Sequence, residues 1–310
     1  MAKRFFRKLA VLTKAEVTYG VDSTPTGAAN AMQMTAVSIT PLGGEEESRE
    51  LLLPYFGHQG VLLVGNYVEL QGSVELAGAG AAGTVPAYGA LLRACSMSEV
   101  TVAATSVTYA PVSNAPESAV IYANFDGVNH AMLGVRGTWS LELAPKRIPR
   151  IRFTLRGLLG PIADVALPAV TLTGFKKPLV VSTVNTPTRS LHGYAALWES
   201  VSLDIGNTVE LRNLIGEDSV QITNRQSIGT AVIEAASMAI KNWFSIAQAH
   251  TVGALSVIHG VGAGNIVEIA AAGVQLGRPT QGQTQGILNY SIPLMFTPTA
   301  GDDEFSIIVR

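Results

Sequence analysis

The sequence contains few charged residues, and this scarcity limits what the protein can bind. Asp, Glu, Lys and Arg make up 14% of the 310 residues, whereas soluble globular proteins carry about 25%. The net charge of -2 gives no reason to expect electrostatic capture of nucleic acid or of an anionic membrane. Apolar residues make up 47% of the chain, which excludes a disordered protein.

Residues that commonly carry chemistry are also scarce or scattered. Cys95 is the single cysteine, so the chain can form neither an intrachain disulfide nor a cysteine-rich metal site. The five histidines show no metal-ligand spacing, and no nucleophile-elbow motif accompanies a suitable histidine. We expect no catalytic residue, no metal and no cofactor, and we interpret the chain as a non-enzyme. An enzyme with dispersed catalytic residues would need a pocket that contains perturbed carboxylates.

Long apolar runs are missing as well, although the mean hydropathy is +0.30. The best candidate, residues 157–174, is interrupted by Pro161, Asp164 and Pro168, so we expect no membrane-spanning helix. High apolar content combined with little charge and no span indicates surfaces that are buried against other subunits.

Strict alternation of apolar and polar residues is the main pattern that is present. It runs through residues 68–76, 133–143 and 150–156, and a period of two predicts strands with one buried face. Residues 145–149 connect two of these strands, which predicts an antiparallel pair. Asp126-Gly127 is a strong hairpin signal between residues 120–125 and 128–132.

Only two segments are predicted to be helical, and one falls in each half of the chain. They are residues 86–97 and 237–250. AVSITPLGG (36–44) and SVSLDIGNT (200–208) both read as a short strand that enters a glycine-containing turn. In each half an alternating strand, a helix and a final strand pair follow. We therefore predict a duplication, with one domain in residues 1–160 and a similar one in residues 161–310.

Two glycine-rich segments have a structural interpretation. GAGAAG (78–83) fits the dinucleotide-binding pattern, but that site needs a parallel βαβ unit, and this sheet is predicted to be antiparallel. We interpret it as a small-residue loop, and HGVGAG (259–264) as a turn within a hairpin. Cys95 lies on the apolar side of the first predicted helix and is expected to be a small buried side chain.

Several further segments share a specific order along the first half of the chain. They are EVTYGVDSTPTGAANAMQMTAVSITPL (16–42), RELLLPYFG (49–57), VELAGAG (74–80), PAYGALLRACSM (86–97), VTYAPVS (107–113), IYANFDGVNHAMLGVRGTWSLEL (121–143) and IPRIRFTLRGLLGP (148–161). In this order they resemble the phage tail tube proteins. None of them is a catalytic motif.

The resemblance implies a structural virion protein. In that family the subunit is a β-sandwich or half-barrel with a flanking helix, and the inner sheets of the subunits join into a continuous β-barrel ring. Stacked rings form the conduit for genome ejection. We accordingly predict a mainly β fold with two tail-tube-type domains, each with one flanking helix. If the second half is a true copy, a trimer gives a pseudo-sixfold ring; if it is a decoration, a hexamer is expected.

The resemblance also implies partners and a location. The expected partners are other copies of the chain, the tape-measure protein in the lumen, the tail terminator and distal tail proteins, and passing DNA that is bound without sequence specificity. The expected location is the phage tail, assembled in the host cytoplasm, with no membrane contact. The alternative is a tail-tip or capsid-decoration protein that forms discrete oligomers.

Candidate lumen residues alternate along one strand face, where carboxylates would avoid trapping phosphates. They are Glu69, Gln71, Ser73 and Glu75, with Asp204, Glu210, Glu217, Asp218 and Glu234 as looser candidates in the second half. Alternation does not tell which face points inward, so an ordinary outer surface is an equal interpretation.

Candidate ring-stacking residues lie in two segments. One is an exposed basic arm, residues 1–14, and the other is a long loop, residues 43–66, which is too apolar to be surrounded by water alone. The candidates are Lys3, Arg4, Phe5, Phe6, Glu45, Glu46, Glu47, Leu51, Leu52, Tyr55 and Phe56.

Overall fold

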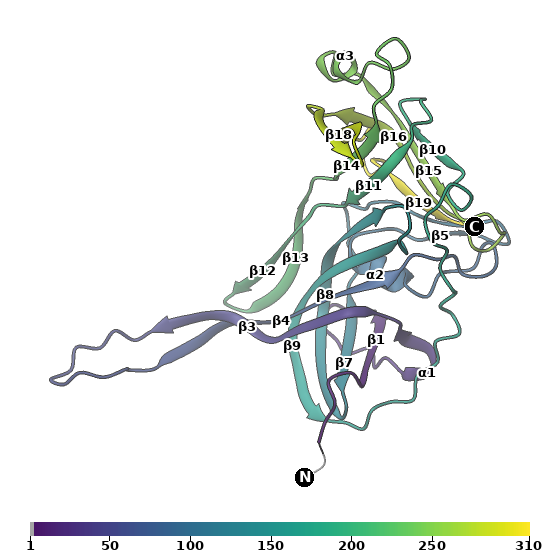
Figure 1. Ribbon diagram of the computed structural model, residues 1–310. Coiled ribbons are helices and arrows are strands. Elements are labelled where there is room, and N and C mark those ends of the chain that lie inside the picture. The colour runs from purple at the N-terminus through teal and green to yellow at the C-terminus, as the bar shows by residue number, and fades with distance from the viewer. Residues whose placement is uncertain (1–2) are drawn as a thin grey trace.

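The protein is mainly β, as the sequence predicts. The computed structural model describes residues 3–310 and shows a broad body, a smaller group of strands above it and one long projecting hairpin (Figure 1). The first half contains β1 (Leu9–Ala15), β2 (Ala31–Met32), β3 (Thr35–Ser48), β4 (Val61–Glu75), β5 (Val100–Val102), β6 (Ser106–Tyr109), β7 (Ala119–Phe125), β8 (Val128–Leu143) and β9 (Arg150–Asp164). The second half contains β10 (Thr188–Leu191), β11 (Trp198–Asp204), β12 (Asn207–Leu214), β13 (Glu217–Arg225), β14 (Ile228–Glu234), β15 (Val252–His259), β16 (Val267–Leu276), β17 (Thr280–Thr284), β18 (Ile287–Phe296) and β19 (Ser306–Val309).

The alternating segments form strands with one buried face. In β8 the side chains of Val135, Trp139 and Leu141 are buried, and in β9 those of Ile151 and Phe153 are fully buried. The predicted hairpin at Asp126-Gly127 is confirmed, since Phe125 pairs with Val128 across it. Pairing of β8 with β9 confirms the predicted antiparallel pair.

The helices are shorter than predicted. The first, α2, covers only Gly89–Ala94, and the second, α3, covers only Trp243–Gln248. The helix N-cap is Asn242 rather than Ser237, and its side chain accepts a hydrogen bond from the Ser245 amide at 3.0 Å. A four-residue helix that was not predicted, α1 (Gly27–Asn30), precedes β2. No helix among residues 3–310 is long and apolar enough to cross a membrane.

The two halves have the same strand order. In the first half the pairings give β1-β7-β8-β9-β4-β3. In the second half they give β10-β15-β16-β18-β14-β11. All of these pairs are antiparallel, and α2 and α3 follow the corresponding strands β4 and β14. Strand β17 continues the path of β16 along β18 after a short interruption at residues 277–279.

The two halves are joined by two strand pairs and by a shared core. The end of β8 pairs with β11, and β19 pairs with both β16 and β6. The Trp139 and Phe305 rings meet edge to face, with their centroids 5.7 Å apart. One hydrophobic cluster includes buried residues from both halves. A division at residue 160 remains a prediction, and β9 itself continues to Asp164.

The two glycine-rich segments pack against each other. The Gly80 amide donates to the Gly264 carbonyl at 2.8 Å, and the Gly78 amide donates to the Asn265 side chain at 2.8 Å. A Cβ atom on Gly78 would overlap the carbonyl oxygen of Gly264. Glycine is needed here because the backbones of the two halves approach too closely for a side chain.

This packing predicts a position-specific effect on stability. We expect Gly78→Ala to lower the free energy of unfolding by about 1–3 kcal/mol, because the added methyl group meets backbone that cannot easily move. Gly262→Ala, in the facing loop, has open space around its Cβ position and serves as the matched control. Urea denaturation of both variants is the measurement, and equal stability of the two would contradict the close packing.

Candidate assembly surfaces

The predicted lumen residues share the polar face of β4. Val68, Leu70 and Val74 are buried on the opposite face. Gln71 is exposed, Glu69 and Glu75 are partly exposed, and Ser73 is buried. The predicted alternation is therefore confirmed in β4, which has one polar face and one face that packs into the hydrophobic core.

The neighbouring strand β9 neutralises these carboxylates. Glu69 and Arg156 form an ion pair at 3.1 Å, and Glu75 and Arg150 approach to 3.6 Å. The Arg156 guanidinium also lies over the Tyr67 ring, 4.5 Å from its centroid. Ser73 is paired with Arg152 across the sheet. The sheet face thus carries both signs of charge, which the sequence of β4 alone does not reveal.

The looser candidates of the second half lie on several strands. Asp204 is on β11 and Glu234 is on β14, whereas Glu210, Glu217 and Asp218 are on the β12–β13 hairpin. That hairpin forms a separate two-stranded sheet, which contacts β8, β9 and β4 of the first half. Its carboxylates therefore lie on a different sheet from the one that carries Asp204 and Glu234.

The β12–β13 hairpin is held against the first half by hydrogen bonds from the buried side chain of Arg136. Arg136, on β8, donates to the Val220 carbonyl at 2.8 Å and to the Gln221 side chain at 2.7 Å. Val220 also donates its amide hydrogen to the Tyr19 hydroxyl at 2.6 Å. These bonds tie the hairpin of the second half to strands of the first half, so it lies along the body rather than projecting from it (Figure 1).

The predicted long loop of residues 43–66 is largely a β-hairpin arm. β3 continues to Ser48 and β4 begins at Val61, so only residues 49–60 form the loop at its tip. The prediction of a loop was wrong because the GGEEES segment has no apolar alternation to indicate a strand. The arm projects far from the body (Figure 1).

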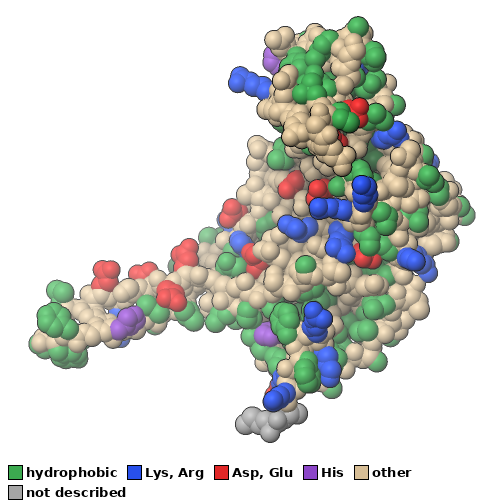
Figure 2. Space-filling view, in the orientation of Figure 1, with side chains coloured by type: hydrophobic (Ala, Val, Ile, Leu, Met, Phe, Trp, Pro, Cys, Tyr) green, Lys and Arg blue, Asp and Glu red, His purple; other side chains and the backbone are tan. Residues whose placement is uncertain are grey.

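The arm presents apolar and acidic residues to solvent. Leu52 and Phe56 at the tip are 101% and 106% exposed, and Leu51 and Tyr55 are also exposed. Figure 2 shows an apolar tip and acidic residues along the stem. Glu45, Glu46 and Glu47 are exposed, and no ion pair within residues 3–310 involves them. A surface of this kind is expected where another molecule binds.

The predicted N-terminal arm is shorter than expected. Residues 9–15 form β1, which pairs with β7, and four of its side chains are buried, while Met1 and Ala2 lie outside the described residues. The exposed candidates are Lys3, Arg4, Phe5 and Phe6.

The remaining N-terminal segment is held against the body. Arg4 pairs with Asp164 at 2.6 Å, the Phe5 amide donates to Asp126 at 2.8 Å, and Phe6 packs on Phe125. This segment lies at the bottom of Figure 1, away from the tip of the arm. The two groups of stacking candidates are therefore not brought together within one chain.

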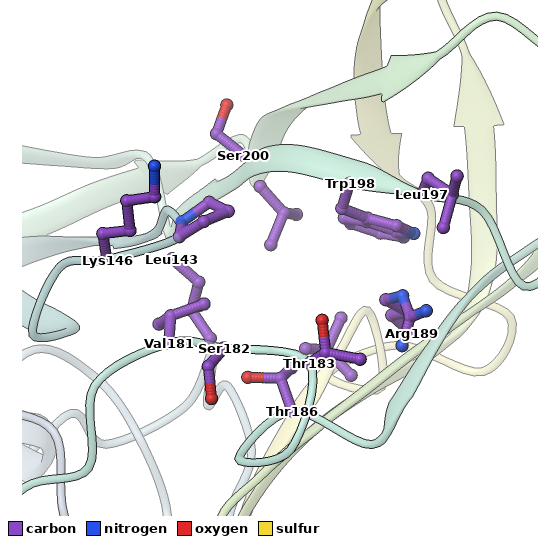
Figure 3. A pocket seen from close by; sticks show the side chains of 13 residues that line it. Leu143, Lys146, Val181, Ser182, Thr183, Thr186, Arg189, Leu197, Trp198 and Ser200 are labelled. Atoms are coloured by element: carbon purple, nitrogen blue, oxygen red, sulfur yellow. The ribbon is translucent and has the colours of Figure 1, made fainter.

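A cavity of about 340 Å³ lies between the end of β8, β11 and the segment that contains Val181. Figure 3 shows Trp198 facing residues 181–186 across it. The charged residues that line it are Lys146 and Arg189, and its lining includes no carboxylate, histidine or cysteine. It therefore offers no acid–base pair. Among residues 3–310, no group of three or more His, Cys, Asp or Glu side chains could hold a metal ion.

Cys95 and His259 serve the core. Cys95 is fully buried, and burial raises the pKa of its thiol. His259 Nε2 donates to the Leu179 carbonyl at 3.1 Å, so Nδ1 accepts from the Thr186 hydroxyl at 3.0 Å. Burial lowers the pKa of His259, and the bond to Leu179 opposes this effect. The neutral imidazole is therefore the form that the fold accommodates.

Three histidines predict how stability depends on pH. Burial lowers the pKa values of His130, His192 and His259 in the folded chain. Below the unfolded value of about 6.5, the unfolded chain binds more protons, so the free energy of unfolding should fall as the pH drops from about 7 to 5.

Urea denaturation at pH 7.5 and at pH 5.5 measures this effect. We expect His259→Asn to reduce the difference between the two pH values. His58→Asn, in the exposed tip of the arm, is the control and should leave that difference unchanged. An unchanged pH dependence in His259→Asn would show that His259 does not contribute.

Comparison with known proteins identifies a family. A family model described as phage tail tube protein matches residues 7–296, which is nearly the whole chain and includes both halves. No curated protein matches the chain.

Proposed function

The chain belongs to the phage tail tube protein family, and we propose that copies of it assemble into stacked rings that form the conduit for genome ejection into the host cell. The observation that carries this proposal is the strand order that occurs twice in one chain. Each half supplies an antiparallel sheet with one buried face, as a segment of a ring wall requires. Closing sheets into a ring also satisfies strand edges that would otherwise remain unpaired.

A ring of three chains is the stoichiometry that we favour. Two equivalent halves in each chain give a pseudo-sixfold ring, and cyclic symmetry requires that each chain contact two neighbours through different surfaces. The tape-measure protein fills the lumen during assembly in the host cytoplasm, and DNA passes through later without sequence-specific contacts. Tail terminator and distal tail proteins close the two ends of the tube.

The polar face of β4 and β9 is our proposal for the lumen wall. Its two carboxylates, Glu69 and Glu75, are paired with Arg156 and Arg150, whereas Arg152 on the same face has no ion pair among the described residues, so the wall presents less positive charge to a passing phosphate backbone than three unpaired arginines would. Unpaired arginines would bind phosphates and release counterions, which slows movement of the DNA. The exposed tip of the arm, with Leu52 and Phe56, and the N-terminal Phe5 and Phe6 are our proposal for the contacts between stacked rings.

The lumen proposal predicts an effect of charge on DNA delivery. We expect Glu69→Gln together with Glu75→Gln to slow ejection several-fold, more so at low salt, because Arg150 and Arg156 lose their partners. Particles that carry Glu117→Gln together with Glu268→Gln, which remove ion-pair partners of Arg93 and Arg310 outside β4 and β9, are the matched control. Ejection rates measured by release of a fluorescent DNA dye should separate the two variants. Equal ejection rates in the two variants would show that the polar face of β4 and β9 does not line the lumen.

Electron microscopy of the purified chain tests the assembly itself. We expect stacked rings with threefold symmetry and six similar lobes when they are viewed along the tube axis. True sixfold rings would retain the tube but overturn the trimer. Discrete particles that never stack would overturn the tube and favour the tail-tip or capsid-decoration alternative.

A further inference from the structure

We propose that the contact between the two halves of one chain is repeated between copies, so that β3 of one copy pairs antiparallel with β17 of the next. This inference rests on the proposed ring. It identifies the two surfaces that meet and the register in which they meet. The occupant of each free edge is therefore a second copy of this chain.

The pairing of β8 with β11 within one chain gives the register that we expect between copies. Val201, Ser202, Leu203 and Asp204 of β11 pair with Leu143, Glu142, Leu141 and Ser140 of β8. This pairing joins β3-β4-β9-β8 to β11-β14-β18-β17 in one antiparallel sheet of eight strands. Within the described residues, β3 and β17 are its two outer strands, because β3 pairs only with β4 and β17 only with β18.

Strand β17 occupies the position of the end of β8. Ser140 pairs with Arg152, which pairs with Ser73 of β4. In the second half, Thr280 pairs with Ser291, which pairs with Val232 of β14. The strands β4 and β14 hold the same place in the two strand orders, and Ser73 on β4 is equivalent to Val232 on β14. Thr280 therefore corresponds to Ser140, and Gln281 and Gly282 correspond to Leu141 and Glu142.

Strand β3 occupies the position of β11. Ser38, Ile39 and Thr40 pair with β4 at the places where Ser202, Leu203 and Asp204 pair with β14. The sequences agree with this alignment, since Val-Ser-Ile (37–39) corresponds to Val-Ser-Leu (201–203). Two independent relations, the pairing register and the sequence, therefore give the same correspondence.

Transferring the internal register to the free edges gives a specific pairing. Thr40 of one copy lies opposite Thr280 of the next, Ile39 opposite Gln281, and Ser38 opposite Gly282. The leucines of β8 are replaced by glutamines in β17, so the contact between copies is more polar than the internal one. This difference suits a chain that must remain soluble before it assembles.

Burial supports the pairing. At the internal junction Val201 and Leu203 are only 6% and 3% exposed, because β8 covers them. The corresponding Val37 and Ile39 on the free edge remain half-buried. Residues 35–40 and β17 contain no charged residue or proline, which are the usual means of protecting a free edge. Both edges are therefore open to pairing.

The β12–β13 hairpin supports the same arrangement. It continues β11 and β14 beyond the junction and lies on β8 and β9, where Arg156 donates to the Val209 carbonyl at 3.5 Å. The β3–β4 arm continues β3 and β4 in the same way, but Leu62, Leu63 and Val64 on it are exposed. When β3 pairs with β17, the base of the arm reaches the neighbouring copy.

Engineered disulfides test the register in assembled rings. We expect Thr40→Cys with Thr280→Cys to form covalent multimers under mild oxidation, because directly opposed Cα atoms lie about 4.5–5.5 Å apart, within the range for a disulfide. Thr40→Cys with Thr284→Cys is the control, since Thr284 lies four residues farther along the strand, about 13 Å away. Cys95 is fully buried and should not contribute.

Each outcome of this experiment bears on the proposal. Covalent multimers in the first variant alone, and dimers when the two single variants are mixed, support the register. Intact rings with equal cross-linking in both double variants overturn the proposed pairing but leave the tube standing. A reconstruction of the rings in which the strand beside β17 is not β3 also overturns it. Absence of rings in the unmodified chain overturns the proposed function and this pairing together.

Discussion

The antiparallel pairing of β8 with β11 is the interaction on which the rest of the structure depends. It turns two separate sheets into one, so the backbone groups at two inner edges are satisfied within the chain. The shared core follows from it, because Leu141 and Leu203 are brought face to face on the buried side. The same constraint leaves two outer edges without a partner strand among the described residues, and residues 35–40 of β3 and the whole of β17 contain no charged residue to protect them.

The polar face of this sheet combines contributions from strands that are distant in the sequence. Glu69 and Arg156 are far apart in the chain, yet they form an ion pair because β4 and β9 are neighbours. A face with paired charges differs physically from a face with carboxylates alone, since it presents hydrogen-bonding groups without a strong net field. The family match, which covers both halves, agrees with a structural protein whose surfaces serve assembly.

Local pattern predicted the strands well and the contacts between them poorly. Alternation of apolar and polar residues is a local property, so β4, β8 and β9 could be identified from the sequence, and the mainly β fold with them. The sequence of the arm predicts a loop because its stem is rich in glutamate and glycine and lacks apolar alternation. The helices were predicted too long, since the apolar stripe of residues 237–250 continues through a turn that precedes Asn242. The pairing of β8 with β11 and the packing of the glycine-rich segments join residues far apart in the chain, and no local pattern records them.

The covalent link between the halves has a kinetic consequence. A junction formed within one chain is governed by the effective concentration of its two parts, which is on the order of millimolar for short connections. The corresponding junction between separate molecules depends on the concentration of free subunits. The proposed ring of three chains would thus require only half of its wall contacts to form by collision. In that ring the junction within the chain and the junction between copies would differ in chemistry, with Leu141 at the first and Gln281 at the second.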